Sequence, residues 1–341
     1  MDRTQLIETA QAIVADGKGI LAADESTPTI EKRFASIGAE NTEEKRAEYR
    51  GLLFMTEGME KYISGVILYD ETIRQSSLGE GASFPKLLSG KGVLPGIKVD
   101  TGAKPLAGHA EEKVTEGLDG LRERLEEYYE LGARFAKWRA VITIGGGIPS
   151  RACLEVNAHA LARYAALCQE AGIVPIVEPE VLMDGNHSLN TCFEETEETL
   201  SIVFHELFKQ GIMLEGMILK PNMVISALDC SEQDSVEEVA DATIECFLRV
   251  VPSAVPGICF LSGGQSDLVA TRHLNAMNVM NDALPWKLSF SYGRALQAAA
   301  LTAWGGKSEN IPEAQKAFYH RAQCNGAAAL GHYSNEMENQ V

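Results

Sequence analysis

Two short segments of the chain place like-charged side chains two residues apart. FAKWR contains Lys137 and Arg139, and VEPE contains Glu178 and Glu180. Residues i and i+2 of a strand point to the same face, so each segment would present a pair of charges to one surface. Two cations suit a phosphorylated or carbanionic substrate, and two carboxylates in one site can act as an acid and a base. A structural ion network is an equally open interpretation.

Lys220 ends the apolar run MILKPN. Burial and a second cation nearby, such as Lys137, would both favour the uncharged amine at this position. A free amine is the nucleophile that forms an imine with a carbonyl compound. A salt bridge between Lys220 and Glu178 is the alternative, and spacing does not decide between the two.

Two glycine-containing segments, FLSGGQS and SYGRAL, follow the last two expected strands. Gly263, Gly264 and Gly293 would let backbone N–H groups approach phosphate oxygens, and Arg294 could add a bidentate contact. The loops after strands seven and eight of a (β/α)₈ barrel often bind phosphate, so these segments predict a phosphate site.

An apolar run followed by a longer helical pattern recurs along the chain. Such runs suit strands buried on both faces of a parallel sheet. They favour an α/β fold of the TIM (β/α)₈ barrel type with extra N- and C-terminal helices. A doubly wound open sheet is the alternative, although no GxGxxG follows the first run. The expected strands are residues 19–25, 63–70, 95–100, 133–141, 173–181, 213–222, 257–264 and 286–294.

Nearly all of these runs carry a charged or hydroxyl-bearing residue near the C-terminal end. In a barrel these ends meet at one mouth, where the active site forms. Buried charges must be paired or functional, so stability alone explains the pattern poorly. The residues include Asp24, Lys98, Lys137, Glu178, Lys220, Ser262 and Ser291.

Composition excludes several classes of protein. The 341 residues carry a formal net charge of −18, which argues against nucleic acid or an anionic membrane as the main partner. The 7 cysteines form no CxxC pair, so a disulfide framework is not expected and a cytoplasmic location is predicted. No segment resembles a signal peptide or a membrane span. The histidines do not cluster with Cys or carboxylate at metal-ligand spacing, so no metal and no cofactor are predicted.

The segments together resemble the class I fructose-bisphosphate aldolases. The resemblance extends in the same order over nearly the whole chain, to about Tyr333. It rests on GKGILAADEST, GIKVD, KPLAG, FAKWR, IVPIVEPE, LKPNM, FLSGGQS, FSYGRAL and AWGGK.

The resemblance implies a role for each matching residue. Lys220 would form the Schiff base with C2 of the ketose, and Glu178, with Glu180 beside it, would move protons during dehydration. Asp24 would assist cleavage of the C3–C4 bond, and Lys137 would stabilise charge. The implied substrate-binding residues are Ser262, Gly263, Gly264, Ser291, Gly293 and Arg294 toward the C1 phosphate, and Ser26, Thr29, Arg33, Lys98 and Arg139 toward the C6 phosphate.

The implied reaction is the reversible cleavage of fructose 1,6-bisphosphate in glycolysis and gluconeogenesis, by a homotetramer whose single catalytic domain spans residues 1–341. A Schiff-base aldolase preferring another phosphorylated sugar, or a non-catalytic scaffold, are the alternatives. Animal relatives carry a longer tail whose last residue is a catalytic tyrosine, whereas this chain ends at Val341. The acidic segment 334–341 is expected to be flexible, repelled from a cationic mouth and catalytically idle.

Overall fold

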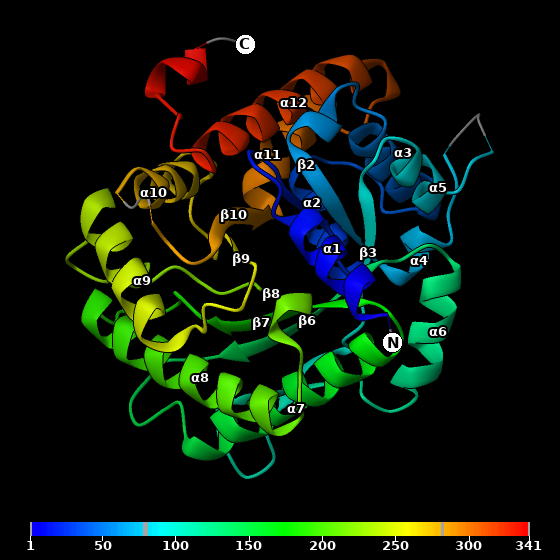
Figure 1. Ribbon diagram of the computed structural model, residues 1–341. Coiled ribbons are helices and arrows are strands. Elements are labelled where there is room, and N and C mark those ends of the chain that lie inside the picture. Colours follow the sequence, from blue (N-terminus) through cyan, green and yellow to red (C-terminus); the bar gives the residue numbers. More distant parts are fainter. Residues whose placement is uncertain (1, 78–80, 281–282, 340–341) are drawn as a thin grey trace.

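The structure, a computed structural model, describes residues 2–77, 81–280 and 283–339. Eight parallel strands close into a barrel in the order β1-β10-β9-β8-β7-β6-β3-β2 (Figure 1). Each expected run contributes one strand, which confirms the TIM barrel. The strands are β1 (Gly19–Ala23), β2 (Ile63–Leu68), β3 (Leu94–Lys98), β6 (Phe135–Ile142), β7 (Val174–Val181), β8 (Ile218–Leu219), β9 (Gly257–Phe260) and β10 (Lys287–Tyr292).

Helices surround the barrel, and several begin at a serine. Ser150, Ser188 and Ser235 each accept a backbone N–H in the first turn of their helix, which satisfies an otherwise unpaired donor. The helices are α1 (Arg3–Ile13), α2 (Thr27–Ser36), α3 (Glu43–Phe54), α4 (Asp70–Ile73), α5 (Phe84–Gly90), α6 (Leu121–Glu130), α7 (Arg151–Glu170), α8 (Leu189–Lys209), α9 (Val236–Val250), α10 (Asp267–Met280), α11 (Arg294–Trp304) and α12 (Ile311–Ala328).

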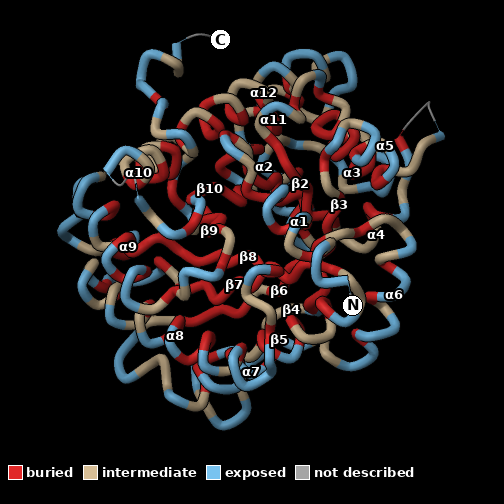
Figure 2. Tube along the Cα trace, in the orientation of Figure 1, coloured by how far each residue is buried: buried red, intermediate tan, exposed pale blue. Residues whose placement is uncertain are grey.

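Apolar side chains fill the end of the barrel where the strands begin. The Phe135 ring occupies this interior, and a Cβ on Gly96 or Gly65 would lie only 2.2 Å or 2.8 Å from it. Residues of α1, including Leu6 and Ile13, pack against the same cluster. Figure 2 shows the barrel strands as predominantly buried. Apolar packing therefore fills the barrel interior at this end.

The sixth strand is shorter than expected. Leu214–Gly216 forms a 3-10 turn, and β8 contains only two residues, whereas 213–222 was expected to be extended. The backbone pairing continues past β8, because Lys220 N–H donates to the Val177 carbonyl at 2.8 Å. Pro221 has no N–H to extend the ladder. A separate two-stranded hairpin of β4 (Gly102–Pro105) and β5 (Lys113–Glu116) was not predicted.

The described part of the C-terminal segment packs on the helical shell. Asn335–Asn339 forms a 3-10 turn, which Figure 1 shows in red beyond the end of α12. Arg272 donates to Asn335, and Met337 packs against the core. Residues 340 and 341 lie outside the described ranges. Within those ranges, none of the helices is both long and apolar enough to span a bilayer.

Candidate active site

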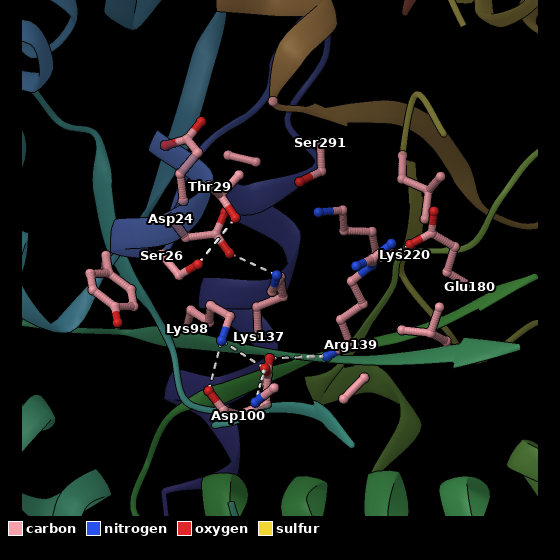
Figure 3. Close-up of a pocket in the computed structure, with 18 of the residues that line it drawn as sticks. Asp24, Ser26, Thr29, Lys98, Asp100, Lys137, Arg139, Glu180, Lys220 and Ser291 are labelled. Atoms are coloured by element: carbon pink, nitrogen blue, oxygen red, sulfur yellow. Dashed lines mark hydrogen bonds and ion pairs between the residues drawn. The ribbon is translucent and has the colours of Figure 1, made fainter. Parts of the chain in front are cut away.

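The C-terminal ends of the strands surround a cavity of about 1290 Å³. Every residue predicted for the site lines it except Glu178, which is buried beneath it with 3% of its surface exposed. The lining residues from the prediction are Asp24, Ser26, Thr29, Arg33, Lys98, Lys137, Arg139, Glu180, Lys220, Ser262, Gly263, Gly264, Ser291, Gly293 and Arg294. The barrel therefore gathers the predicted side chains at one mouth, and Figure 3 shows how those it labels lie.

Two lysines and two carboxylates form the centre of the cavity. Lys137 Nζ lies 2.7 Å from Asp24 Oδ2 and 3.3 Å from Glu178 Oε2. Lys220 Nζ lies 3.1 Å from the other oxygen of the same carboxylate, Glu178 Oε1. All four residues are at most 9% exposed. Glu178 is thus placed to exchange a proton with Lys220, and Lys137 links Glu178 to Asp24.

The charges of this cluster determine its protonation. Burial by itself would raise the pKa of Asp24, but the positive charges of Lys137 and Lys220 outweigh burial and lower the pKa to about 2. The pKa of Glu178 is likewise lowered against the effect of burial by Lys137 and Lys220. For Lys137, burial would lower the pKa, but Asp24 and Glu178 raise it above its usual value. At neutral pH both carboxylates are therefore ionised, and Lys137 is an ammonium.

A second pair of charges lies beside this cluster. Arg139 Nε donates to Glu180 Oε2, so the two like-charged pairs seen in the sequence meet as opposite charges across β6 and β7. The neighbouring strand contributes Lys98, whose Nζ lies 2.7 Å from Asp100 Oδ1. Asp100 also accepts the backbone N–H of Arg139 at 3.3 Å. Asp100 thus holds the Lys98 ammonium and the backbone of Arg139, and the dashed lines around Asp100 in Figure 3 mark these contacts.

One wall of the cavity is suited to bind an oxyanion. Gly263 and Gly264 have φ values of +55° and +93°, which side-chain-bearing residues rarely adopt. A Cβ on Gly264 would lie 3.2 Å from Arg294 Nη2, so glycine leaves room for the guanidinium. Gly293 caps the N-terminus of α11, where helix N–H groups favour anions. Ser291 Oγ is buried nearby without a hydrogen-bond partner in the described structure.

The adjoining wall, reached from β1 beside β10, offers hydroxyls and cations. β1 leads directly into α2, whose N-cap is Ser26, and Ser26 Oγ lies 3.1 Å from Thr29 Oγ1. Arg33, one helical turn further along, pairs with Glu25. Together with Lys98 these groups make a second potential anion site. The cavity therefore offers two groups of potential anion ligands beside the lysine–carboxylate cluster.

Sequence reasoning missed two acidic residues that hold site cations in place. Glu25 pairs with Arg33 and also accepts Gln297 Nε2 at 2.9 Å. Asp100 holds Lys98, as described above. Both residues lie just beyond a strand end, within segments already noted as polar. Their position at the end of a strand was the one signal of a role in the site. The sequence spacing did not reveal which cations they hold, because these contacts depend on the tertiary structure.

The expectation that no histidine joins a potential metal-binding group was wrong. In the described part of the chain, His320, Cys324 and Glu338 bring their donor atoms within 4.8 Å of one another, away from the barrel mouth. The His–Cys spacing of four residues on one helix was overlooked. The third residue, Glu338, joins the pair only because the C-terminal segment folds back onto the helix.

Comparison with known proteins finds relatives that match nearly the whole chain. Residues 5–341 match the family model "Fructose-bisphosphate aldolase class-I". The chain is 60% identical over 332 residues to a protein of Xylella fastidiosa (strain 9a5c) named "Probable fructose-bisphosphate aldolase class 1", covering 97% of this chain and 99% of that protein. It is 52% identical to "Fructose-bisphosphate aldolase" of Dictyostelium discoideum, covering 97% and 93%.

A solved structure supports the same relationship. Fructose-bisphosphate aldolase from Plasmodium falciparum, determined in complex with TRAP and a small-molecule inhibitor, superposes with a TM-score of 0.96. The sequences are 48% identical, and the match covers 97% of this chain and 96% of the other. The likeness therefore includes the barrel and the helices around it.

Proposed function

The chain belongs to the class I fructose-bisphosphate aldolase family, and from this premise we propose that it cleaves fructose 1,6-bisphosphate through a Schiff base at Lys220. The products are dihydroxyacetone phosphate and glyceraldehyde 3-phosphate, and the reaction is reversible. The observation that carries the proposal is the position of Lys220, 3.1 Å from Glu178 in a cavity that is also lined by two groups of potential anion ligands.

Imine formation uses the Lys220–Glu178 pair. Glu178 is ionised, so it first accepts a proton from the Lys220 ammonium and frees the amine to attack C2 of the ketose. The resulting carbinolamine loses its hydroxyl as water when Glu178 returns the proton. Lys137, 3.3 Å from the same carboxylate, stabilises the oxygen charge that develops on the way. The product is an iminium ion on Lys220.

Cleavage of the C3–C4 bond uses Asp24. As the C4 hydroxyl proton moves to Asp24, the C4–O group becomes the aldehyde, and the C3–C4 electron pair moves into a neutral enamine. A carboxylate is a much weaker base than an alkoxide, so this transfer accompanies bond cleavage rather than preceding it. Protonation at C3 and hydrolysis of the iminium then release dihydroxyacetone phosphate.

The two walls bind the two phosphates in this proposal. The wall of Ser262, Gly264 and Arg294 takes the C1 phosphate, next to the imine. Lys98 and Arg33 take the C6 phosphate with the hydroxyls at the start of α2. Binding at both ends holds the reacting carbon atoms against Lys220, and orientation of this kind contributes several kcal/mol to catalysis, roughly 7–11 in the best cases.

Replacing Arg294 by Ala should weaken catalysis through the C1 phosphate. Arg294 is an exposed side chain at the N-terminus of α11, so its loss should leave the fold intact. A charge-assisted contact is worth about 1.5–3 kcal/mol, so kcat/KM for the bisphosphate should fall on the order of ten- to a hundred-fold. Assays should compare the bisphosphate with a ketose lacking the C1 phosphate, on which the variant should lose much less. Equal losses on both substrates would assign Arg294 a structural role.

Turnover should survive exhaustive removal of metal ions. The iminium nitrogen is the electron sink of the proposed reaction, so no cation is required at the substrate carbonyl. We expect the cleavage rate after dialysis against a strong chelator to equal that of untreated protein. A large loss that a divalent ion restores would contradict the Schiff-base mechanism.

The segment after Tyr333 should be catalytically idle. Its described part packs against α12 through the Arg321–Glu338 ion pair, which keeps it on the helical shell. Truncation after Tyr333 should leave both bisphosphate cleavage and exchange of the C3 proton of dihydroxyacetone phosphate within a few-fold of the full chain. Loss of exchange with retention of cleavage would show that the segment protonates the enamine.

A turnover assay across phosphorylated sugars would distinguish the alternatives. An aldolase for another sugar phosphate would show its highest kcat/KM on that sugar, and a non-catalytic scaffold would turn over none. The intact cluster of Lys220, Glu178, Lys137 and Asp24 favours a catalyst.

We also propose a homotetramer that acts in the cytoplasm, in glycolysis and gluconeogenesis. The family supports the pathway, and an Arabidopsis thaliana relative with 51% identity is named cytosolic. The cysteines are all free in the structure, which suits a reducing compartment. Sedimentation equilibrium tests the assembly, and a mass other than four chains would contradict it.

A further inference from the structure

Three side chains that bind transition metals meet on α12, outside the cavity. His320 and Cys324 are four residues apart and so lie on the same face of the helix. Glu338 reaches them from the turn Asn335–Asn339. His320 Nε2 is 3.7 Å from Cys324 Sγ and 3.7 Å from Glu338 Oε2.

Both separations from His320 Nε2 match a tetrahedral metal site, and all three donor atoms lie within 4.8 Å of one another. Zinc bonds of about 2.0–2.3 Å at tetrahedral angles place neighbouring donor atoms roughly 3.3–3.8 Å apart. Imidazole, thiolate and carboxylate are all zinc ligands, and the thiolate disfavours Mg²⁺ and Ca²⁺. We propose that His320, Cys324 and Glu338 bind one Zn²⁺, which fastens the C-terminal segment to α12. Water would complete the coordination.

Two neighbouring side chains hydrogen-bond to the Glu338 carboxylate and orient it. Arg321 Nη1 donates to Glu338 Oε2, and Tyr333 OH donates to Glu338 Oε1 at 2.8 Å. Ligating carboxylates are typically hydrogen-bonded in this way. The positive charge of Arg321 opposes a second cation, but thiolate and carboxylate together supply two negative charges. On binding, the Cys324 thiol proton leaves to solvent, and its place is taken by the metal.

The site is accessible from solvent on one side. Cys324 is fully buried, whereas the His320 and Glu338 side chains are 13% and 25% exposed. A hydrated ion can therefore approach past these two ligands and reach the thiol. None of the three residues lines the active-site cavity, so the role is structural and separate from turnover.

Titration with Co²⁺ tests the coordination, because a cobalt–thiolate bond produces a charge-transfer absorption band. The metal-free full-length protein should take up one Co²⁺ per chain with this band, and Zn²⁺ should displace it. Cys324→Ser should lack the band, and Glu338→Gln should bind Co²⁺ at least about 10- to 100-fold more weakly. Cys230→Ser, which changes a partly exposed cysteine elsewhere, is the matched control and should behave like the unaltered chain.

Hydrogen exchange of residues 334–339 tests the consequence for the C-terminal segment. One equivalent of Zn²⁺ should slow exchange there in the unaltered chain and in Cys230→Ser, but not in Cys324→Ser. Turnover should be the same in all variants, with or without Zn²⁺. Absence of the thiolate band, its persistence in Cys324→Ser, or unchanged affinity in Glu338→Gln would overturn the site. Binding without slower exchange would overturn its role in holding the segment.

Discussion

Lys220→Arg is expected to lower kcat by on the order of 10⁴-fold or more, because it removes the nucleophile while keeping a positive charge. Arginine remains protonated and does not form an imine with a ketone. Loss of a covalent nucleophile costs about 10⁶-fold in well-studied hydrolases, so a fall of this size is reasonable here. The ion pair with Glu178 can persist, which keeps the cavity charged and folded.

Borohydride trapping identifies the lysine directly. Reduction in the presence of dihydroxyacetone phosphate should inactivate the unaltered protein and label the peptide that contains Lys220. Lys220→Arg should carry no label, whereas Lys104→Arg, at an exposed position on the β4–β5 hairpin, should be labelled and active. Label on Lys98 or Lys137, or residual label in Lys220→Arg, would refute the assignment.

Asp24→Asn is expected to separate carbon–carbon cleavage from imine formation. The amide has the size of the carboxylate and can still accept a hydrogen bond from Lys137, but it does not accept the C4 hydroxyl proton. Loss of a positioned base typically costs about 10²–10⁴-fold, so cleavage should fall by that factor. Lys220 keeps its contact with Glu178, so trapping with dihydroxyacetone phosphate should persist.

Two rates measured on the same variant test this separation. Bisphosphate cleavage should fall, while exchange of the C3 proton of dihydroxyacetone phosphate should change by no more than a few-fold. Asp16→Asn, which removes an exposed carboxylate paired with Lys287, is the control and should alter neither rate. A parallel fall in cleavage and exchange would mean that Asp24 acts by adjusting the charge of the lysine cluster.

The most predictable parts of this protein are those that depend on short-range pattern. Repeated apolar runs and helical segments predicted the barrel, because the period of burial is a local property of each strand and helix. The side-chain alternation within β6 and β7 put Lys137 with Arg139, and Glu178 with Glu180, on common faces. Polar strand ends then predicted one mouth containing all of these residues.

The sequence by itself therefore determined the barrel, the end of it that carries the site and most of the side chains gathered there. Tertiary structure alone decided which charges meet: Lys137 lies between Asp24 and Glu178, and Arg139 pairs with Glu180. It also decided that Glu25 and Asp100 hold cations of the site and that Glu338 lies against α12. The physical reason is that these contacts join elements distant along the chain. Their geometry depends on barrel closure, strand register and the packing of loops, none of which a local pattern specifies.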